Sequence, residues 1–345
     1  MAAHNQSKKS LRFGMDTLMQ SVAPVVSRDW HVLAASQDLP SGSLRAVCLL
    51  GQDLVLWRGL DGALHLWRDR CPHRSVRLSR GRVVDKTLVC AYHGMVYGPE
   101  GQCVQVPTHP GYIPPSHACV PTYRVQERYG LIFACLGTPV GDLPTFPEWE
   151  EPGFVTGLSG PHMCQTGGYR AIENFLDITH FPFVHPEILG DPARPAIADY
   201  KVVVDAQGVH IPNLRVWQPD PLGIGKGDYV NYSYHISRPL TGYLRKVSPG
   251  GECLALLYCV TPVTEEMCVG WMLMAMNFIG ASGLPAAIAF QDRVIQQDIT
   301  NLETHLLKQL PLGRQVEFHV PGDRASLAYR QWLQQLGVTY GILGA

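Results

Sequence analysis

The sequence has no excess of charge of either sign and no long apolar run. Its 28 lysines and arginines nearly balance its 29 aspartates and glutamates, so the net charge is -1 over 345 residues. No basic stripe stands out, and we therefore expect no nucleic-acid partner. No apolar segment is long enough to cross a bilayer, so we expect no membrane insertion.

The N-terminal segment lacks the continuous apolar core and the small-residue cleavage site of a secretory signal. We therefore expect residues 1–21 to be a polar, mobile segment and the protein to be cytoplasmic. Ten cysteines are spread through a long chain without such a signal. Most of them are expected to be reduced thiols that pack as small apolar residues.

The first part of the chain predicts a β domain over residues 22–140. Short β-like runs alternate there with turns such as Asp61-Gly62. A proline-rich stretch near Gly137–Phe154 is the candidate linker, because its prolines disfavour a regular element.

Residues 141–345 predict a second domain. A helix is expected over about Arg170–Phe181 and a second helix over about Pro285–Gln309. Between them, four β-like segments are expected, over residues 200–211, 229–238, 254–263 and 268–278. Strands enclosed by helices indicate an α+β domain with an antiparallel sheet. The predicted fold class of the chain is therefore α+β, with an all-β domain first.

Two short segments of the first domain each carry one cysteine and one histidine. They are Cys71-Pro72-His73 and, after sixteen residues, Cys90-Ala91-Tyr92-His93. Two thiolates and two imidazoles on separate loops can hold zinc, or a cluster of two irons and two sulfides. A zinc finger usually pairs like ligands, whereas here each loop supplies one of each kind, which favours a Rieske cluster.

A second group of metal ligands is expected in the second domain. Asn174, Asp177 and His180 are three residues apart, so a helix would present them along one side. Pro182 would stop that helix and let His185 turn back toward His180. Two histidines and one carboxylate form the facial triad of non-haem iron(II) oxygenases.

The carboxylate of this triad must come from elsewhere in the chain. Asp292 lies in an apolar helical stripe with Ile288, Ile295 and Ile299, and a buried carboxylate needs a strong partner such as a cation. Asp298 is the competitor, on a more mixed face. The pattern favours Asp292 as the metal ligand.

The motifs Cys71-Pro72-His73-Arg74-Ser75 and Cys90-Ala91-Tyr92-His93-Gly94 resemble the two Rieske signatures of aromatic ring-hydroxylating and demethylating oxygenases. The pattern ENFLDITHFPFVHP, from residue 173, and Gln291-Asp292-Arg293 are similar to the catalytic-domain signatures of the same family, especially of its homotrimeric monooxygenases and demethylases. The family often has proline where Ala91 stands and tryptophan where Met95 stands, and neither position is a ligand.

The resemblance implies a Rieske domain followed by a helix-grip-like catalytic domain. It implies one 2Fe-2S cluster held by Cys71, His73, Cys90 and His93, and one mononuclear Fe(II) held by His180, His185 and Asp292. It also implies a head-to-tail homotrimer in which Asp177 bridges a cluster histidine of one subunit to a ligating histidine of the next. Asn174 and Asp177 are the candidate catalytic residues.

The implied activity is the insertion of an oxygen atom from dioxygen into an aromatic or heterocyclic substrate, by hydroxylation or by O- or N-demethylation. Most methionines of the strand-like segment WMLMAMNF are expected to be ordinary sheet core. A largely apolar pocket would suit such a substrate. The sequence has no flavin or nicotinamide fingerprint, so electrons from NAD(P)H are expected to arrive through a separate ferredoxin or flavin-containing reductase.

Two rival interpretations remain at this point. The first is a Rieske electron carrier without oxygenase activity, which needs no mononuclear iron. The second is a binding module stabilised by zinc, which would be colourless. Iron content and the spectrum of a Rieske cluster separate these from the oxygenase.

Overall fold

The computed structural model describes residues 24–221, 226–313 and 315–344. The backbone divides into two compact units, residues 1–143 and 144–345. The division falls three residues from the boundary expected at 140/141, while the expected N-terminal segment over residues 1–21 lies outside the described residues. Within the described ranges, no helix is both long and apolar enough to cross a membrane.

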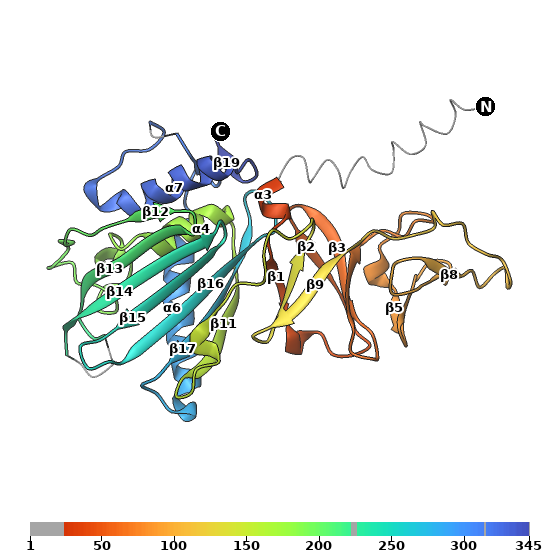
Figure 1. Ribbon diagram of the computed structural model, residues 1–345, viewed down its shortest axis with the longest axis horizontal. Coiled ribbons are helices and arrows are strands. Elements are labelled where there is room, and N and C mark those ends of the chain that lie inside the picture. The colour runs from red at the N-terminus through yellow and green to blue at the C-terminus, as the bar shows by residue number, and fades with distance from the viewer. Residues whose placement is uncertain (1–23, 222–225, 314, 345) are drawn as a thin grey trace. The chain divides into compact units, whose positions relative to one another are not determined.

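The first unit consists of two antiparallel sheets (Figure 1). The larger sheet has the order β1-β10-β9-β4-β3-β2 and the smaller one the order β5-β6-β7-β8. The strands are β1 (His31–Ala35), β2 (Leu44–Leu49), β3 (Gln52–Arg58), β4 (Leu64–Arg68), β5 (Arg82–Val84), β6 (Thr87–Val89), β7 (Val96–Tyr97), β8 (Cys103–Gln105), β9 (Thr122–Arg128) and β10 (Leu131–Cys135), preceded by the short helix α3 (Pro24–Ser27). A buried cluster that includes Trp57, Trp67 and Tyr97 packs beneath the smaller sheet's loops.

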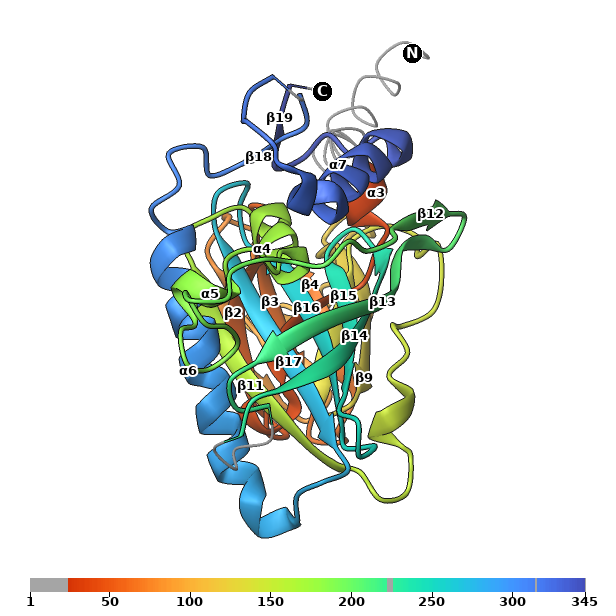
Figure 2. The same cartoon turned by 90° about the vertical axis from the view of Figure 1, so that its left-hand side faces the viewer.

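The second unit is a curved antiparallel sheet with helices packed on it (Figure 2). Its strand order is β11-β17-β16-β15-β14-β13-β12. The elements are β11 (Val155–Cys164), α4 (Gly168–Leu176), α5 (Phe181–Val184), β12 (Val203–Asp205), β13 (Gly208–Gln218), β14 (Asp228–Arg238), β15 (Thr241–Val247), β16 (Cys253–Pro262), β17 (Cys268–Met276), α6 (Leu284–Leu302) and α7 (Arg324–Leu336), with the small parallel pair β18 (Leu310–Pro311) and β19 (Ile342–Leu343). The predicted α+β fold class, with its all-β first domain, is confirmed.

Two glycines let the helices approach this sheet closely. A Cβ atom on Gly157 of β11 would lie 2.7 Å from Cδ1 of Leu284 in α6, and one on Gly242 of β15 would lie 2.7 Å from Cε1 of Phe175 in α4. Helix α6 therefore runs against β11, as Figure 2 shows, and α4 covers the middle of the sheet. The space left between these helices and the sheet contains the second candidate site.

Both predicted helices of this unit are shorter than expected. The expected helix over Arg170–Phe181 ends at Leu176, and the one over Pro285–Gln309 ends at Leu302. In the second case the Thr304 hydroxyl donates to the carbonyl of Asn301, at 2.6 Å, and so competes with helical hydrogen bonding.

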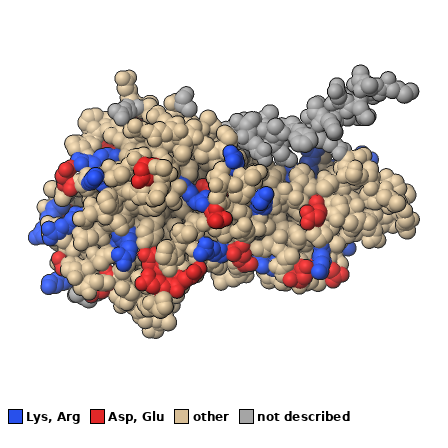
Figure 3. All heavy atoms as spheres, in the orientation of Figure 1, with Lys and Arg blue, Asp and Glu red and all other residues tan. Residues whose placement is uncertain are grey.

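Charges of both signs are interspersed on the face drawn in Figure 3. No broad surface of one sign appears on that face, which agrees with the nearly balanced composition.

Inside the second unit, Arg170 and Arg330 each donate to Glu317 at 2.6 Å, and Arg330 also donates to Glu173 at 2.6 Å. This ion network joins α4 to α7 and braces the helix that leads into the site.

Candidate metal centres

The two loops with paired cysteine and histidine have the same backbone structure. In each loop the cysteine N–H donates to the carbonyl five residues later, at 2.8 Å from Cys71 and 2.9 Å from Cys90. The cysteine carbonyl accepts from the residue four positions later, Ser75 or Gly94, and both of these have a positive φ, 62° and 68°. Glycine adopts this left-handed conformation without strain, and Ser75 adopts it under the constraint of the loop. The two loops are therefore a matched pair of tight turns.

The four side chains of these loops are arranged with sulfur inside and imidazole outside. Cys71 and Cys90 are buried, whereas His73 and His93 are exposed, with ring centroids 4.7 Å apart. The Tyr97 hydroxyl lies 3.1 Å from Cys71 Sγ. Burial and the neighbouring Cys71 raise the pKa of the Cys90 thiol, so a thiolate here needs a cation beside it. Paired buried thiols beneath paired exposed imidazoles fit a cluster with cysteines on one iron and histidines on the other.

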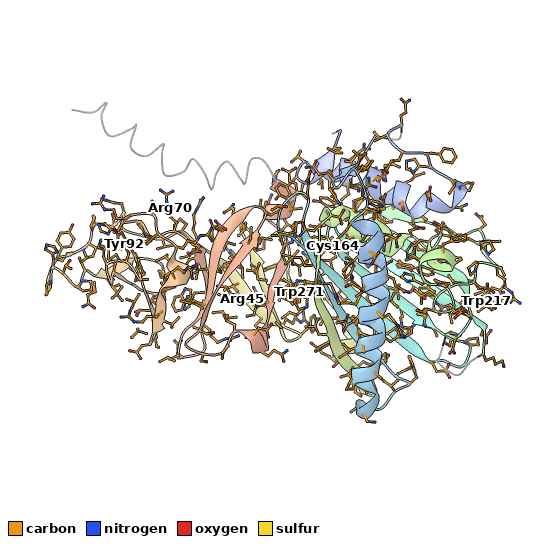
Figure 4. All side chains as sticks on the ribbon, turned by 180° about the vertical axis from the view of Figure 1, so that it is seen from behind. Arg45, Arg70, Tyr92, Cys164, Trp217 and Trp271 are labelled. Carbon is orange, nitrogen blue, oxygen red and sulfur yellow. The ribbon has the colours of Figure 1, made fainter. Side chains whose placement is uncertain are left out.

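The end of the first unit that carries these loops also exposes Tyr92 and Arg70 (Figure 4). The Tyr92 ring is tilted against the His93 ring, with centroids 3.9 Å apart. Cys103, which the sequence analysis did not include among the ligands, is buried in the adjacent core.

In the second unit, Asp177 follows the last residue of α4 and has an extended conformation. Its Oδ1 accepts hydrogen bonds from the N–H and the hydroxyl of Thr179, at 2.7 and 2.6 Å. Its Oδ2 lies 3.1 Å from Nδ1 of His180. The expected pairing of Asp177 with His180 is present, although it arises from a turn after the helix and not from one helical face. Asn174 lies in the last turn of α4 and lines a pocket between the helices and the sheet.

Three side chains converge on one point beyond this turn. Nε2 of His180 and Nε2 of His185 lie 3.3 and 3.0 Å from Oδ1 of Asp298. Their ligand atoms all lie within 4.8 Å of one another. The short helix α5, which begins after His180 and contains Pro182, turns the chain so that the two imidazoles lie edge to face, with ring centroids 5.2 Å apart. This arrangement can bind a single metal ion.

The remaining nitrogen of each imidazole is held by an oxygen acceptor. Nδ1 of His180 is next to Asp177, and Nδ1 of His185 lies 2.9 Å from Oε1 of Gln297. A proton on each Nδ1 satisfies these contacts and leaves Nε2 with its lone pair directed toward Asp298. Acceptors of this kind fix the tautomer of histidines that bind metals.

The structure corrects the choice of carboxylate. Asp298, whose side chain is 17% exposed, joins the two histidines, whereas the Asp292 side chain is 45% exposed. Asp292 accepts a hydrogen bond of 2.6 Å from the Ser159 hydroxyl and lies 3.3 Å from Nε2 of His162. The buried residues of α6 form a stripe made of Gln291, Val294, Ile295, Ile299 and Leu302. Asp298 lines the pocket beside this stripe, whereas Asp292 lies at the edge of the stripe.

The pKa values of His180 and Asp298 indicate a site built for a cation. Burial alone would lower the pKa of His180, but the carboxylates of Asp177 and Asp298 raise it to about 9. Burial alone would raise the pKa of Asp298, but the hydrogen bonds of His180 and His185 lower it to about 2. Two carboxylates thus favour positive charge at this point, and a metal ion would supply it.

A pocket opens beside the triad between the helices and the sheet. Most of its lining is apolar or aromatic, including Phe175, Phe181, Tyr232, Tyr234, Leu244, Leu256, Tyr258, Met272, Ile295 and Ile299. Cys164, labelled in Figure 4, lies at the end of β11 and also contacts it. The sequence analysis missed Gln297, the pocket tyrosines and Lys246. Gln297 stands next to Asp298 in the sequence, but nothing in the pattern marked it as a partner of His185.

Comparison with known proteins finds a matching family model in each of the two units. Residues 29–124 match the family model of the Rieske [2Fe-2S] domain, and residues 169–339 match that of the vanillate O-demethylase oxygenase C-terminal domain. The chain is 31% identical over 326 residues to methylxanthine N1-demethylase NdmA of Pseudomonas putida, which covers 89% of this chain and 88% of that protein. Oxidoreductase NdmD of the same organism is 40% identical over 114 residues, 33% of this chain and 19% of that protein.

Solved structures show the same fold. The structure of Pseudomonas putida NdmA with caffeine superposes with a TM-score of 0.77 at 28% identity, covering 89% of this chain and 90% of that one. Dicamba monooxygenase bound to dicamba has a TM-score of 0.73 at 21% identity, covering 90% and 97%, a likeness of fold alone. This chain belongs to the Rieske non-haem iron oxygenases, and it is the oxygenase component of such an enzyme. Its cofactors are a Rieske cluster and iron.

Proposed function

We propose that Cys71, Cys90, His73 and His93 hold the Rieske cluster, and that His180, His185 and Asp298 hold the mononuclear iron. The observation that carries the second assignment is the convergence of two Nε2 atoms on Oδ1 of Asp298, with each Nδ1 occupied by an acceptor. Bound there, iron supplies dioxygen activation, and the cluster supplies electrons to it singly.

The residues of this chain would orient and isolate the reaction. Asp177 and Gln297 fix the imidazoles, so the metal side of each ring is available for coordination. The apolar walls formed by Phe175, Phe181 and Tyr258 exclude water and bind a flat ring. Asn174, at the end of α4, offers an amide to the same pocket and is a candidate for positioning the substrate.

We propose oxidative demethylation as the reaction. Dioxygen, two electrons and two protons would convert an O- or N-methyl group on an aromatic or heterocyclic ring to the free hydroxyl or amine, formaldehyde and water. The similarity to methylxanthine N1-demethylase over nearly the whole chain supports this choice over ring hydroxylation. Formaldehyde measured together with dioxygen uptake, over a panel of methylated rings, tests it. Dioxygen uptake with a hydroxylated ring and no formaldehyde would favour hydroxylation instead.

We further propose that electrons come from NAD(P)H through a separate reductase. The sequence carries no flavin or nicotinamide fingerprint of its own. The partial match to oxidoreductase NdmD supports a partner of that class. A reductase with a flavin and an iron–sulfur centre should bleach the cluster spectrum when NAD(P)H is added.

We propose a homotrimer in which Asp177 links a cluster histidine of one subunit to His180 of its neighbour. The position of Asp177 on Nδ1 of His180 supports the second half of this link. Light scattering should give three times the 38.1 kDa chain mass. Asp177→Asn should keep both metal centres but slow electron transfer between them, and unchanged turnover by this variant would contradict the link.

His180→Ala tests the oxygenase assignment directly. Because His180 is absent from the cluster loops, the variant should retain the Rieske spectrum and lose both mononuclear iron and product formation. Loss of the Rieske spectrum in this variant would overturn the assignment of ligands. Matched purification of wild type under the same anaerobic conditions is the control.

A further inference from the structure

A buried lysine lies in the pocket that contains the iron triad. Lys246 is on β15, where Leu244 and Lys246 are buried and Arg245 between them is exposed. Lys246 is paired with Tyr232 on β14 and with Leu254 on β16. Strand alternation therefore directs its side chain to the same face of the sheet as Leu244, and it contacts the pocket that also contains His180 and Asp298.

The amine is held in place by neutral oxygens. Nζ of Lys246 donates to Oε1 of Gln218 at 3.2 Å and to the carbonyl of Pro221 at 3.1 Å. The Gln218 side chain is completely buried, and its Nε2 donates to the Tyr232 hydroxyl at 2.8 Å, which fixes the amide with its oxygen toward the amine. An ammonium has three N–H donors, so this frame presents a fixed cationic donor to the pocket.

Burial lowers the pKa of Lys246 to about 8, while the charge of Asp220 acts in the opposite direction. The amine is therefore still mostly protonated near neutral pH. A lysine that is only 9% exposed is costly to keep charged unless a ligand or a partner stabilises it. The surrounding surface is otherwise rich in hydrocarbon, so the amine is the natural point for binding an oxyanion.

A row of rings connects this amine to the triad. The Tyr232 ring lies 6.3 Å from that of Phe181, and the Phe181 ring lies 5.1 Å from that of His180, measured between centroids. A ring substrate stacked along this wall would have one end near Lys246 and the other near the histidines.

We infer that Lys246 selects substrates that carry an anionic oxygen group, a carboxylate or a sulfonate, on the aromatic or heterocyclic ring. The inference depends on the proposed function in one respect, which is that this pocket is the substrate site. The alternative is that Lys246 serves only to fasten the end of β13 to the sheet through Gln218 and Pro221. The two roles differ in what they predict for ligands of equal shape and unequal charge.

The test is a binding titration of the purified protein with both metal centres, near pH 7, by calorimetry. The probes are 4-methoxybenzoate and 4-methoxybenzamide, which share a ring and a methoxy group and differ in charge. A hydrogen bond to a charged group predicts that the wild type binds the acid about tenfold to a hundredfold more tightly. Lys246→Met should remove most of that ratio by weakening the acid while leaving the amide unchanged, and Lys246→Arg should retain a preference for the acid.

Lys201→Met is the matched control, because Lys201 is an exposed lysine of the same unit, outside this pocket. It should leave both affinities unchanged. A fastening role would instead make Lys246→Met weaken acid and amide equally. The inference is also overturned, with no variant needed, if benzoate, benzenesulfonate and pyridine carboxylates bind the wild type no more tightly than their uncharged amides.

The outcomes separate this inference from the oxygenase proposal. Preferential binding of acids by a protein that consumes no dioxygen would support the role of Lys246 and contradict the proposed reaction. Demethylation of uncharged rings at a rate unaffected by Lys246→Met, with acids rejected, would sink the role of Lys246 alone.

Discussion

Replacing Asp298 by asparagine should empty the mononuclear site while leaving the cluster intact. Oδ1 of Asp298 lies 3.3 Å from Nε2 of His180 and 3.0 Å from Nε2 of His185, so an ion bound by the two imidazoles would also meet this carboxylate. A unit charge about 4 Å from another, at an effective dielectric constant near 20, contributes about 4 kcal/mol. The substitution should therefore weaken iron binding by about a thousandfold or more.

Iron analysis of anaerobically reconstituted protein measures this effect after loosely bound metal has been removed by gel filtration. Wild type should retain about three irons per chain and Asp298→Asn about two, with the Rieske absorbance unchanged in both. Asp292→Asn is the matched control, because it makes the same chemical change on the same helix at a residue that contacts Ser159. It should retain about three irons.

The reverse pattern would refute the reasoning from geometry. If Asp292→Asn lost the mononuclear iron and Asp298→Asn retained it, the triad seen here would not be the metal site. Circular dichroism of both variants excludes a loss of iron through unfolding.

Three further outcomes follow from contacts at or near the two sites. Tyr97→Phe removes the hydroxyl next to Sγ of Cys71 and should lower the reduction potential of the cluster by about 60 mV in a redox titration, and an unchanged potential would contradict that hydrogen bond. Gln297→Leu frees Nδ1 of His185 and should weaken iron binding by about 10-fold to 100-fold, whereas unaltered affinity in a chelator competition would exclude its role. Burial alone would raise the pKa of Glu317, but Arg170 and Arg330 lower it to about 2. The free energy of unfolding of the wild type should therefore fall as the pH drops from about 4.5 to 2. Glu317→Gln should be less stable at neutral pH and lose less stability over that pH range. Equal pH dependence of the free energy of unfolding in the two proteins would argue against the ion network.

The sign of the last effect follows from linkage. A carboxyl whose pKa is lower in the folded state binds fewer protons when folded, so its contribution to stability is present above the unfolded pKa, about 4.5. That contribution disappears as the pH falls through the folded pKa of about 2.

The two paired turns of the first unit could be predicted from sequence because the cysteine and the histidine of each turn are close neighbours in the chain. Cys71 and His73 share one turn, and Cys90 and His93 share another, so the spacing alone constrains the geometry. The approach of His185 to His180 was equally local, since Pro182 forces a turn between them. Short-range patterns of this kind need no knowledge of tertiary packing.

The carboxylate could not be predicted in the same way, because it depends on the rotation of α6 about its axis. Asp292 and Asp298 both lie within an amphipathic helix, and which one faces the pocket is decided by where α6 rests on β11 through Gly157. Ile295 and Ile299 do belong to the buried stripe of α6, but Gln291, Val294 and Leu302 are buried as well, so the stripe is centred away from Asp292. Periodicity gives the existence of such a stripe more reliably than its centre.

Two strands of the catalytic sheet were missed for related reasons. β11 contains Gly157, Gly160 and Pro161, which weaken a strand pattern, yet it is an edge strand with a bulge at that point. β15 carries Lys246 on a buried face, which disguises its alternation. The residue that hid the strand from sequence analysis is the one to which we assign substrate selection.

The measurement that tests the central claim most directly is the electron-spin resonance spectrum of reduced wild-type protein exposed to nitric oxide. Two iron centres in one chain predict the signal of a reduced Rieske cluster together with that of a separate iron–nitrosyl complex, and His180→Ala should abolish only the second. A Rieske signal with no iron–nitrosyl signal, in protein that holds about two irons per chain, would contradict the claim.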